Sequence, residues 1–177
     1  MKYLIIALII LILVTILILM FILSKNKFLI LNIKLNEADS SIKLFLQKKA
    51  VGLDNIIREI TAKGIDEEKF KDFVKSVDSE KNGYHLHSLL NKYYVKVSKI
   101  LFDNDELSKD EKILSYLTDL KSNEEDLIGS IKFYNDTVVD YNGLLNVFPH
   151  KFFAKILGYN EQQFYNNEKE ELFEILK

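Results

Sequence analysis

The sequence predicts an all-α protein, in which an N-terminal transmembrane helix is followed by an antiparallel up-down-up-down bundle of long helices. Two observations lead to this fold class. Residues 3–23 form an apolar run long enough to span a bilayer, and apolar side chains recur at helical spacing through residues 108–158. No segment alternates polar and apolar residues over a useful length, so we expect no sheet. The connections are short, and short connections between long helices place successive helices antiparallel.

The second half of the chain carries a heptad-like seam. Apolar residues recur there in steps of three and four, and only Glu124 interrupts them. The seam residues are Leu117, Leu120, Leu127, Ile131, Tyr134, Val138, Tyr141, Leu145 and Phe148. This spacing predicts one long helix with one face buried. The four residues 108–111 match a capping box with Ser108 as the N-cap, and Pro149, the only proline, ends the helix near Val147.

The apolar run at residues 3–23 has Thr15 as its only polar side chain. As a helix it would be roughly 31 Å long, which matches a hydrocarbon core of about 30 Å. It exceeds the roughly 7–15 residues of a signal-peptide core, and no small-x-small cleavage site follows it. A domain of this size has no place for a buried helix that is apolar on every face. We therefore expect residues 1–24 to be an uncleaved membrane anchor with a short tail, and residues 25–177 to form the helical domain.

Two further arms precede the seam. Residues 28–62 keep a helical apolar stripe that Lys49 interrupts, and Gly64 is placed to end that helix. No proline or glycine separates the apolar run from this stripe until residue 52, so the two can form one continuous helix. A second arm follows at residues 66–102, with Asp66 as its N-cap and a break at Asn82-Gly83.

The C-terminal arm follows Pro149. Residues 151–157 suffice for two helical turns that end at Gly158. Residues 160–163 match a second capping box, and we expect Asn160 to open a short amphipathic helix. The apolar residues of that helix are Phe164, Tyr165, Leu172, Phe173 and Leu176.

Charge excludes one class of partner and weakly orients the chain. Only Lys2 of the 24 basic residues lies before Ser24, and all 26 acidic residues follow it, so the remainder has a net charge of −3. Nucleic-acid binding needs a basic footprint, which this composition lacks. Lys25, Lys27 and Lys34 follow the apolar run, and the positive-inside rule therefore favours a cytoplasmic domain.

No residue set predicts catalysis, a metal or a cofactor, and we expect a protein that is not an enzyme. His85 and His87 are two residues apart, so on a helix they point some 200° apart and do not share a metal. The acidic run that begins at Asp103 lacks the glycine and the final glutamate of a calcium loop. Its residues fit a solvated loop and a helix cap.

Polar residues on the seam have two readings. Glu124 and the repeated Tyr-Asn pairs, at 134–135 and 141–142, fit a polar groove for a partner. They also fit hydrogen bonds between helices that set the register of the bundle, which we favour.

Residues 128–165 carry a specific motif: two Tyr-Asn pairs one heptad apart, Phe-Pro, an alanine, Gly-Tyr and a late aromatic pair. This resembles the bacterial LemA family. The matching residues are Tyr134, Asn135, Tyr141, Asn142, Phe148, Pro149, Ala154, Gly158, Tyr159, Phe164 and Tyr165. A basic stretch with Lys48, Lys49 and then Asn55 is similar to a second family motif, with lysines where the family prefers arginines.

The resemblance implies a helical bundle anchored by its N-terminus in a bacterial cell membrane, with the domain in the cytoplasm. It implies no activity. Taken with the anchor and the seam, the resemblance favours a single-pass envelope protein that binds other envelope or membrane proteins. A second copy of the same chain is a further candidate partner. A pore-forming or membrane-remodelling protein is the alternative, motivated by the strongly apolar N-terminus. As interaction residues we select the family positions Lys48, Lys49, Asn55, Tyr134, Asn135, Tyr141, Asn142, Phe148, Pro149 and Gly158.

Overall fold

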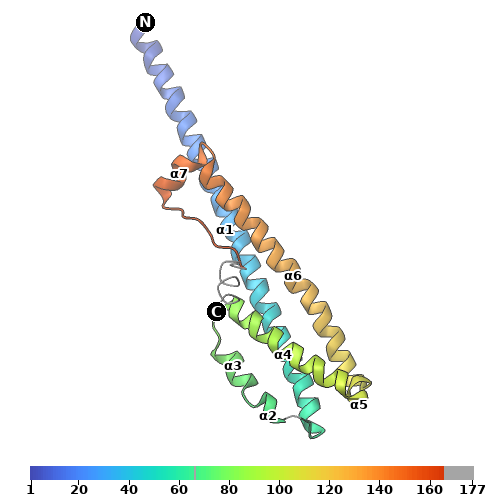
Figure 1. The fold of residues 1–177 in the computed structure, drawn as a ribbon. Helices are drawn as coiled ribbons and strands as arrows, with labels where there is room; N and C mark the ends of the chain where they lie inside the picture. The colour runs from blue at the N-terminus through green and yellow to red at the C-terminus, as the bar shows by residue number, and fades with distance from the viewer. Residues whose placement is uncertain (66, 166–177) are drawn as a thin grey trace. The chain divides into compact units, whose positions relative to one another are not determined.

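The computed structural model describes residues 1–65 and 67–165. This part of the chain forms helices and contains no strand, so the all-α prediction is confirmed (Figure 1). The helices are α1 (Lys2–Ala62), α2 (Glu67–Phe70), α3 (Phe73–Ser79), α4 (Gly83–Asp103), α5 (Asp105–Ser108), α6 (Glu111–Asn146) and α7 (His150–Leu157).

Two compact units share α1 and α6. Unit 1 contains Met1–Glu37 and the described residues from Phe133 onward, and unit 2 contains Ala38–Lys132. Each unit has its own buried core. In unit 1 the core residues are Phe28, Leu35, Val138, Tyr141 and Ala154. In unit 2 the largest fully buried side chains are Ile42, Leu46, Leu53, Ile56, Ile60, Leu90, Val97, Leu107, Ile113 and Leu127.

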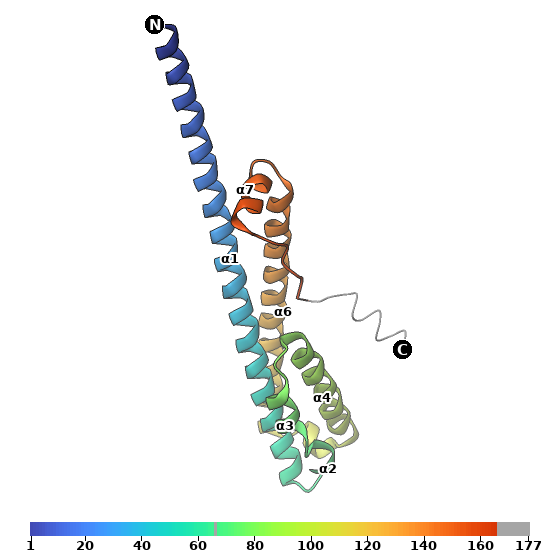
Figure 2. The ribbon, with the colours of Figure 1, turned by 90° about the vertical axis from the view of Figure 1, so that its left-hand side faces the viewer.

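Chain direction alternates within unit 2, but the prediction that residues 66–102 form one interrupted arm is wrong, because α4 runs back against α2 and α3. The 38–62 part of α1 runs one way, α2 and α3 return, α4 reverses again, and the 111–132 part of α6 returns beside α1 (Figures 1 and 2). The contacts between α1 and α6 have antiparallel register. Asn123 Nδ2 donates to the Phe45 carbonyl oxygen at 2.9 Å, and Lys63 Nζ lies 2.8 Å from Asp110 Oδ2 at the other end. Between them the helices approach closely at Gly52, where a Cβ would lie 2.7 Å from Leu120 Cδ2.

Side-chain caps begin helices α4, α5 and α6. Asn82 Oδ1 accepts from the backbone N–H groups of Tyr84 and His85, which confirms the break predicted at Asn82-Gly83. The prediction that Ser108 caps the seam helix is wrong. Ser108 lies at the end of α5, and Asp110 Oδ1 instead accepts from the N–H of Lys112 and Ile113, at 2.9 and 3.2 Å. Asp110 is favoured because its carboxylate also pairs with Lys63.

Unit 1 pairs the beginning of α1 with the end of α6. The rings of Phe28 and Tyr141 meet edge to face, with their centroids 5.4 Å apart. Helix α6 ends at Asn146, so Phe148, the last predicted seam residue, lies beyond the helix and its side chain is 78% exposed. Helix α7 follows and ends at Gly158, as predicted, because Gly158 takes the left-handed conformation at φ 72°.

The C-terminal helix predicted to open at Asn160 is wrong for the residues that can be compared. Residues 159–165 have no helical structure. Asn142 binds both backbone groups of Gln162. Its Nδ2 donates to the Gln162 carbonyl oxygen, and its Oδ1 accepts from the Gln162 N–H, each at 2.9 Å. Asn135 Oδ1 accepts from the Tyr165 N–H at 2.9 Å. The remainder of that predicted helix, and the predicted cap Asp66, lie outside the described residues.

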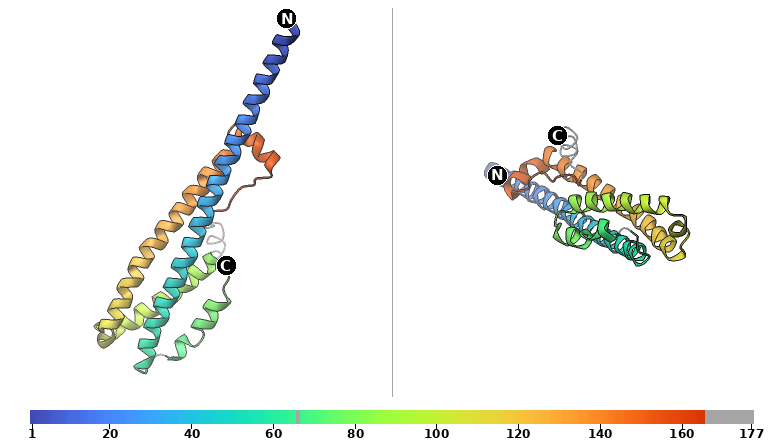
Figure 3. Two further views of the ribbon diagram at one scale, coloured as in Figure 1. Left: turned by 180° about the vertical axis from the view of Figure 1, so that it is seen from behind. Right: turned by 60° about the horizontal axis from the view of Figure 1, so that its bottom comes forward.

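Helix α1 is continuous from Lys2 to Ala62, so the apolar run and the first bundle helix are one helix (Figure 3, left). It ends where predicted, before Gly64 at φ 76°. Its N-terminal part is the one candidate membrane span among the described residues, judged by length and composition. The large apolar side chains of residues 3–19 are exposed throughout, which leaves them free to face lipid.

Candidate functional site

A buried lysine forms the centre of the strongest candidate site, which lies in unit 2. Lys49 projects from α1 and its side chain is only 4% exposed. Its Nζ donates to Glu124 Oε2 on α6 at 2.5 Å and to Asn91 Oδ1 on α4 at 2.6 Å. Three helices therefore meet at one ammonium group. A buried charge needs a partner of opposite charge. This explains why Lys49, which interrupts the apolar stripe of α1, lies opposite Glu124, which interrupts the apolar seam of α6.

Glu124 carries the opposite charge. His87 Nε2 lies 3.6 Å from Glu124 Oε1, on the other side of the carboxylate from Lys49. His87 and Lys49 together hold the pKa of Glu124 at about 2, below its usual 4.5, although partial burial acts in the opposite direction. Glu124 is therefore ionised at neutral pH, and it balances the charge of Lys49 rather than supplying a proton.

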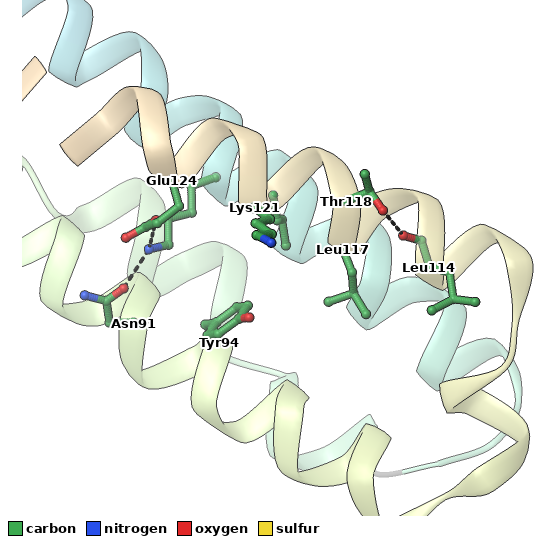
Figure 4. A pocket seen from close by; sticks show the side chains of 9 residues that line it. Asn91, Tyr94, Leu114, Leu117, Thr118, Lys121 and Glu124 are labelled. Atoms are coloured by element: carbon green, nitrogen blue, oxygen red, sulfur yellow. Dashed lines mark hydrogen bonds and ion pairs between the residues drawn. The ribbon is translucent and has the colours of Figure 1, made fainter. Parts of the chain in front are cut away.

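The Lys49 cavity, of about 480 Å³, opens beside this pair (Figure 4). Leu114, Leu117 and Leu120 of α6 give it apolar walls, and Tyr94 of α4 closes one side. Its other lining residues are Lys49, Asn91, Thr118, Lys121 and Glu124. Figure 4 shows Glu124 and Asn91 at one end, Leu114 and Leu117 at the other, and Lys121 between them. The cavity thus combines an apolar wall with one polar end, which is typical of recognition sites.

A second hollow of about 550 Å³ in unit 2 is lined by the other members of the basic motif, Lys48 and Asn55. Lys48 is exposed and its Nζ lies 5.2 Å from the centroid of the Phe45 ring. Consecutive helix residues point about 100° apart, so Lys48 and Lys49 serve different surfaces. The structure therefore separates two residues that the motif places side by side.

The remaining motif residues lie in unit 1 and act on its structure. Tyr141 is buried, and burial raises the pKa of its hydroxyl. Asn135 and Asn142 bind the backbone of residues 162–165. The prediction that these asparagines form hydrogen bonds between helices is therefore wrong, because their partner is a segment that is not helical. The other motif residues are half-buried Tyr134 and Pro149, exposed Phe148, and Gly158 at the end of α7.

Sequence reasoning noted Lys49 and Glu124 separately but did not pair them. Their signal was present, since each is a charge on an otherwise apolar helical stripe and their signs are opposite. Asn91 and Tyr94 gave no such signal, because they lie on an ordinary mixed helix face. His85 and His87 lie in the first turns of α4, exposed and half-buried respectively, as predicted.

These features define the class of protein: a helical bundle with a candidate membrane span and a buried charge pair beside a cavity. Comparison with family models then identifies the family. The model described as "LemA family" matches residues 38–175, so the chain belongs to the LemA family. The match includes unit 2, where the motifs are weakest. A search of curated proteins finds no match to this chain.

Proposed function

We propose that this chain is a single-pass, membrane-anchored protein without enzymatic activity, which binds other proteins of the bacterial envelope through the Lys49 cavity. One observation carries the proposal. Lys49 and Glu124, at the polar end of the cavity, are engaged with one another and with Asn91, while the leucine walls have room for a partner's side chains. Such a site offers shape, apolar surface and an oriented charge pair, which suit recognition.

The experiment that tests this proposal is site-specific photocrosslinking of the full chain in native membranes. A photoreactive residue replaces Tyr94, which lines the cavity and is 41% exposed. We expect a discrete protein adduct. The matched control places the same residue at Phe102, which is on the same helix, is 87% exposed and does not line the cavity.

A second variant tests whether the adduct depends on the cavity. Leu117→Phe fills the wall with a larger apolar side chain without adding charge, and we expect it to remove the Tyr94 adduct. An adduct that persists in Leu117→Phe, or equal adducts at Tyr94 and Phe102, would contradict binding in the cavity.

Membrane anchoring is supported by the length and exposed apolar surface of residues 3–23. We expect the full chain to stay in the membrane fraction through high-salt and alkaline washes. Replacing Ile9 and Ile16 together by arginine puts two charges into the span, each costing about 2.5–3.5 kcal/mol, and should release the protein. Retention of that variant would count against a spanning segment.

The alternative, a pore-forming or membrane-remodelling protein, makes a different prediction for the same preparation. Vesicles loaded with dye and reconstituted with the full chain should retain their contents on the present proposal. Dose-dependent leakage would favour the alternative.

A further inference from the structure

Helix α7 lies against the end of the apolar span within unit 1 (Figures 1 and 2). The rings of Phe21 and Phe153 meet edge to face at 5.5 Å, and His150 Nδ1 lies 2.8 Å from Ser24 Oγ. Ser24 Oγ in turn donates to the Met20 carbonyl oxygen at 2.7 Å, so it is well placed to accept from the His150 ring. Ser24 and His150 are both buried, which fixes α7 at the level where the span ends.

The outer face of α7 consists of two adjacent rows at helical spacing of four. One row is apolar: Phe152 and Ile156 are 58% and 62% exposed, and Phe148, in the turn before α7, is 78% exposed. The other row is basic and consists of Lys151 and Lys155, both exposed. The inner face, with Phe153 and Ala154, is buried against the rest of unit 1. A short helix with this division has the form of an interfacial amphipathic helix.

The two stretches of chain that meet at this helix are basic, and the acidic residues Glu37, Asp140 and Glu161 lie just beyond their ends. Residues 24–36 and 141–160 include five lysines and no aspartate or glutamate. The lysines are Lys25, Lys27, Lys34, Lys151 and Lys155. Folding therefore joins two basic stretches that are more than a hundred residues apart in the chain, beside the end of the span. This surface is complementary to anionic phospholipid headgroups.

We propose that the outer face of α7 binds the surface of the bilayer, with its apolar row in the boundary between headgroups and acyl chains and its lysines on anionic headgroup phosphates. The inference rests on the membrane anchoring proposed above, because the span sets the depth at which α7 lies. It adds a second membrane contact to the one candidate span among the described residues. A second copy fits this face less well, because a symmetric contact would bring the lysines of both copies together.

The absence of tryptophan from the chain allows a direct experiment. Three full-length variants each carry one tryptophan: Phe152→Trp on the outer face of α7, Leu13→Trp in the middle of the span, and Phe102→Trp at an exposed position of α4. Each is reconstituted into vesicles of phosphatidylcholine and phosphatidylglycerol, with and without brominated acyl chains. Brominated chains quench only tryptophan that reaches the bilayer.

We expect Leu13→Trp and Phe152→Trp to lose roughly half or more of their emission and Phe102→Trp to lose little, since interfacial helices lie about 5–10 Å into the headgroup boundary. If Leu13→Trp is quenched and Phe152→Trp behaves like Phe102→Trp, the α7 inference is overturned while anchoring stands. If neither Leu13→Trp nor Phe152→Trp is quenched, both are overturned.

Charge reversal separates the role of the lysines from that of the apolar row. Adding Lys151→Glu and Lys155→Glu to Phe152→Trp should reduce its quenching towards the Phe102→Trp value in phosphatidylglycerol vesicles. The same pair added to Leu13→Trp should leave its quenching unchanged. Unchanged quenching of Phe152→Trp after charge reversal would overturn the assignment of the lysines to anionic headgroups.

Discussion

At the scale of single residues, the Lys49–Glu124 pair is asymmetric. Lys49 is 4% exposed, whereas Glu124 is 32% exposed and has the His87 ring as a second neighbour. Loss of Glu124 would leave an ammonium group buried without its counter-charge. Loss of Lys49 would leave a carboxylate that water can still reach. The free energy of unfolding should therefore respond differently to the two removals.

We accordingly predict that Glu124→Gln destabilises the protein by about 3 kcal/mol and that Lys49→Met costs roughly half as much, because methionine fills the buried volume. Urea unfolding of the full chain in detergent, followed by circular dichroism, measures both. Lys48→Met is the matched control, since Lys48 is exposed, and should change stability by less than about 0.5 kcal/mol. An equal loss in all three variants would contradict the asymmetry.

The depressed pKa of Glu124 also predicts a pH dependence. The folded value is about 2 and the ordinary value is 4.5, so the folded state favours the ionised carboxylate. The stabilisation is fully present above pH 4.5 and is lost as the pH falls from there towards 2. It amounts to roughly 3 kcal/mol.

The urea midpoint of the native protein should thus fall over this pH range more steeply than that of Glu124→Gln. Parallel curves for the two proteins would show that Glu124 is not held ionised by its neighbours.

At the scale of elements, helix α6 organises unit 1 through side chains that bind an extended segment. Asn142 satisfies both backbone groups of Gln162, which would otherwise need water or a helix turn. Asn135 does the same for the N–H of Tyr165. These bonds account for the extended course of residues 159–165, because they occupy backbone groups that a helix would use.

We predict that Asn142→Leu leaves the protein folded and releases residues 159–165. Amide exchange at Gln162 should become at least tenfold faster, since each lost hydrogen bond is worth about 1 kcal/mol and two are lost. Asn146→Leu is the control on the same helix, because Asn146 is exposed and does not contact the segment. Unchanged exchange in Asn142→Leu would show that other contacts hold the segment.

The start of α6 gives a second prediction at this scale. Asp110→Ala should lower the melting temperature further than Asp110→Asn, because asparagine keeps the cap while alanine removes it. Both substitutions remove the charge that faces Lys63, so their difference isolates the cap. Ser108→Ala should be nearly neutral. Thermal unfolding of the three variants decides between Asp110 and Ser108 as the cap.

At the scale of the whole molecule, the lysines near the end of the span bear on sidedness. The sequence places Lys25, Lys27 and Lys34 after the span, and folding adds Lys151 and Lys155 at the same boundary. The cytoplasmic leaflet carries the more negative surface potential, so this arrangement favours the proposed cytoplasmic domain.

The chain has no cysteine, so single cysteines report sidedness cleanly. We predict that Ser79→Cys, at the exposed end of α3, resists an impermeant thiol reagent in intact cells and reacts after lysis. Lys2→Cys, before the span, should react in intact cells. The reverse pattern would place the domain outside.

Most of the architecture was predictable from local patterns. The apolar run, the seam, Gly64, Asn82-Gly83 and Gly158 each specify a helix or its end through neighbours a few residues away. The errors have the same origin. Ser108 and Asn160 match capping motifs locally, but Asp110 gains Lys63 as a partner, and residues 159–165 bind Asn135 and Asn142 on α6.

Periodicity along the chain therefore established the helical class and the candidate span, and the Tyr-Asn and Phe-Pro motifs indicated the LemA family. Tertiary packing alone decided that Lys49 meets Glu124 and Asn91, that Lys48 faces elsewhere, and that α7 brings two lysines to the end of the span. The physical reason is range. Helix formation depends on residues three or four apart, whereas a buried charge and a clustered surface depend on side chains that only folding brings together.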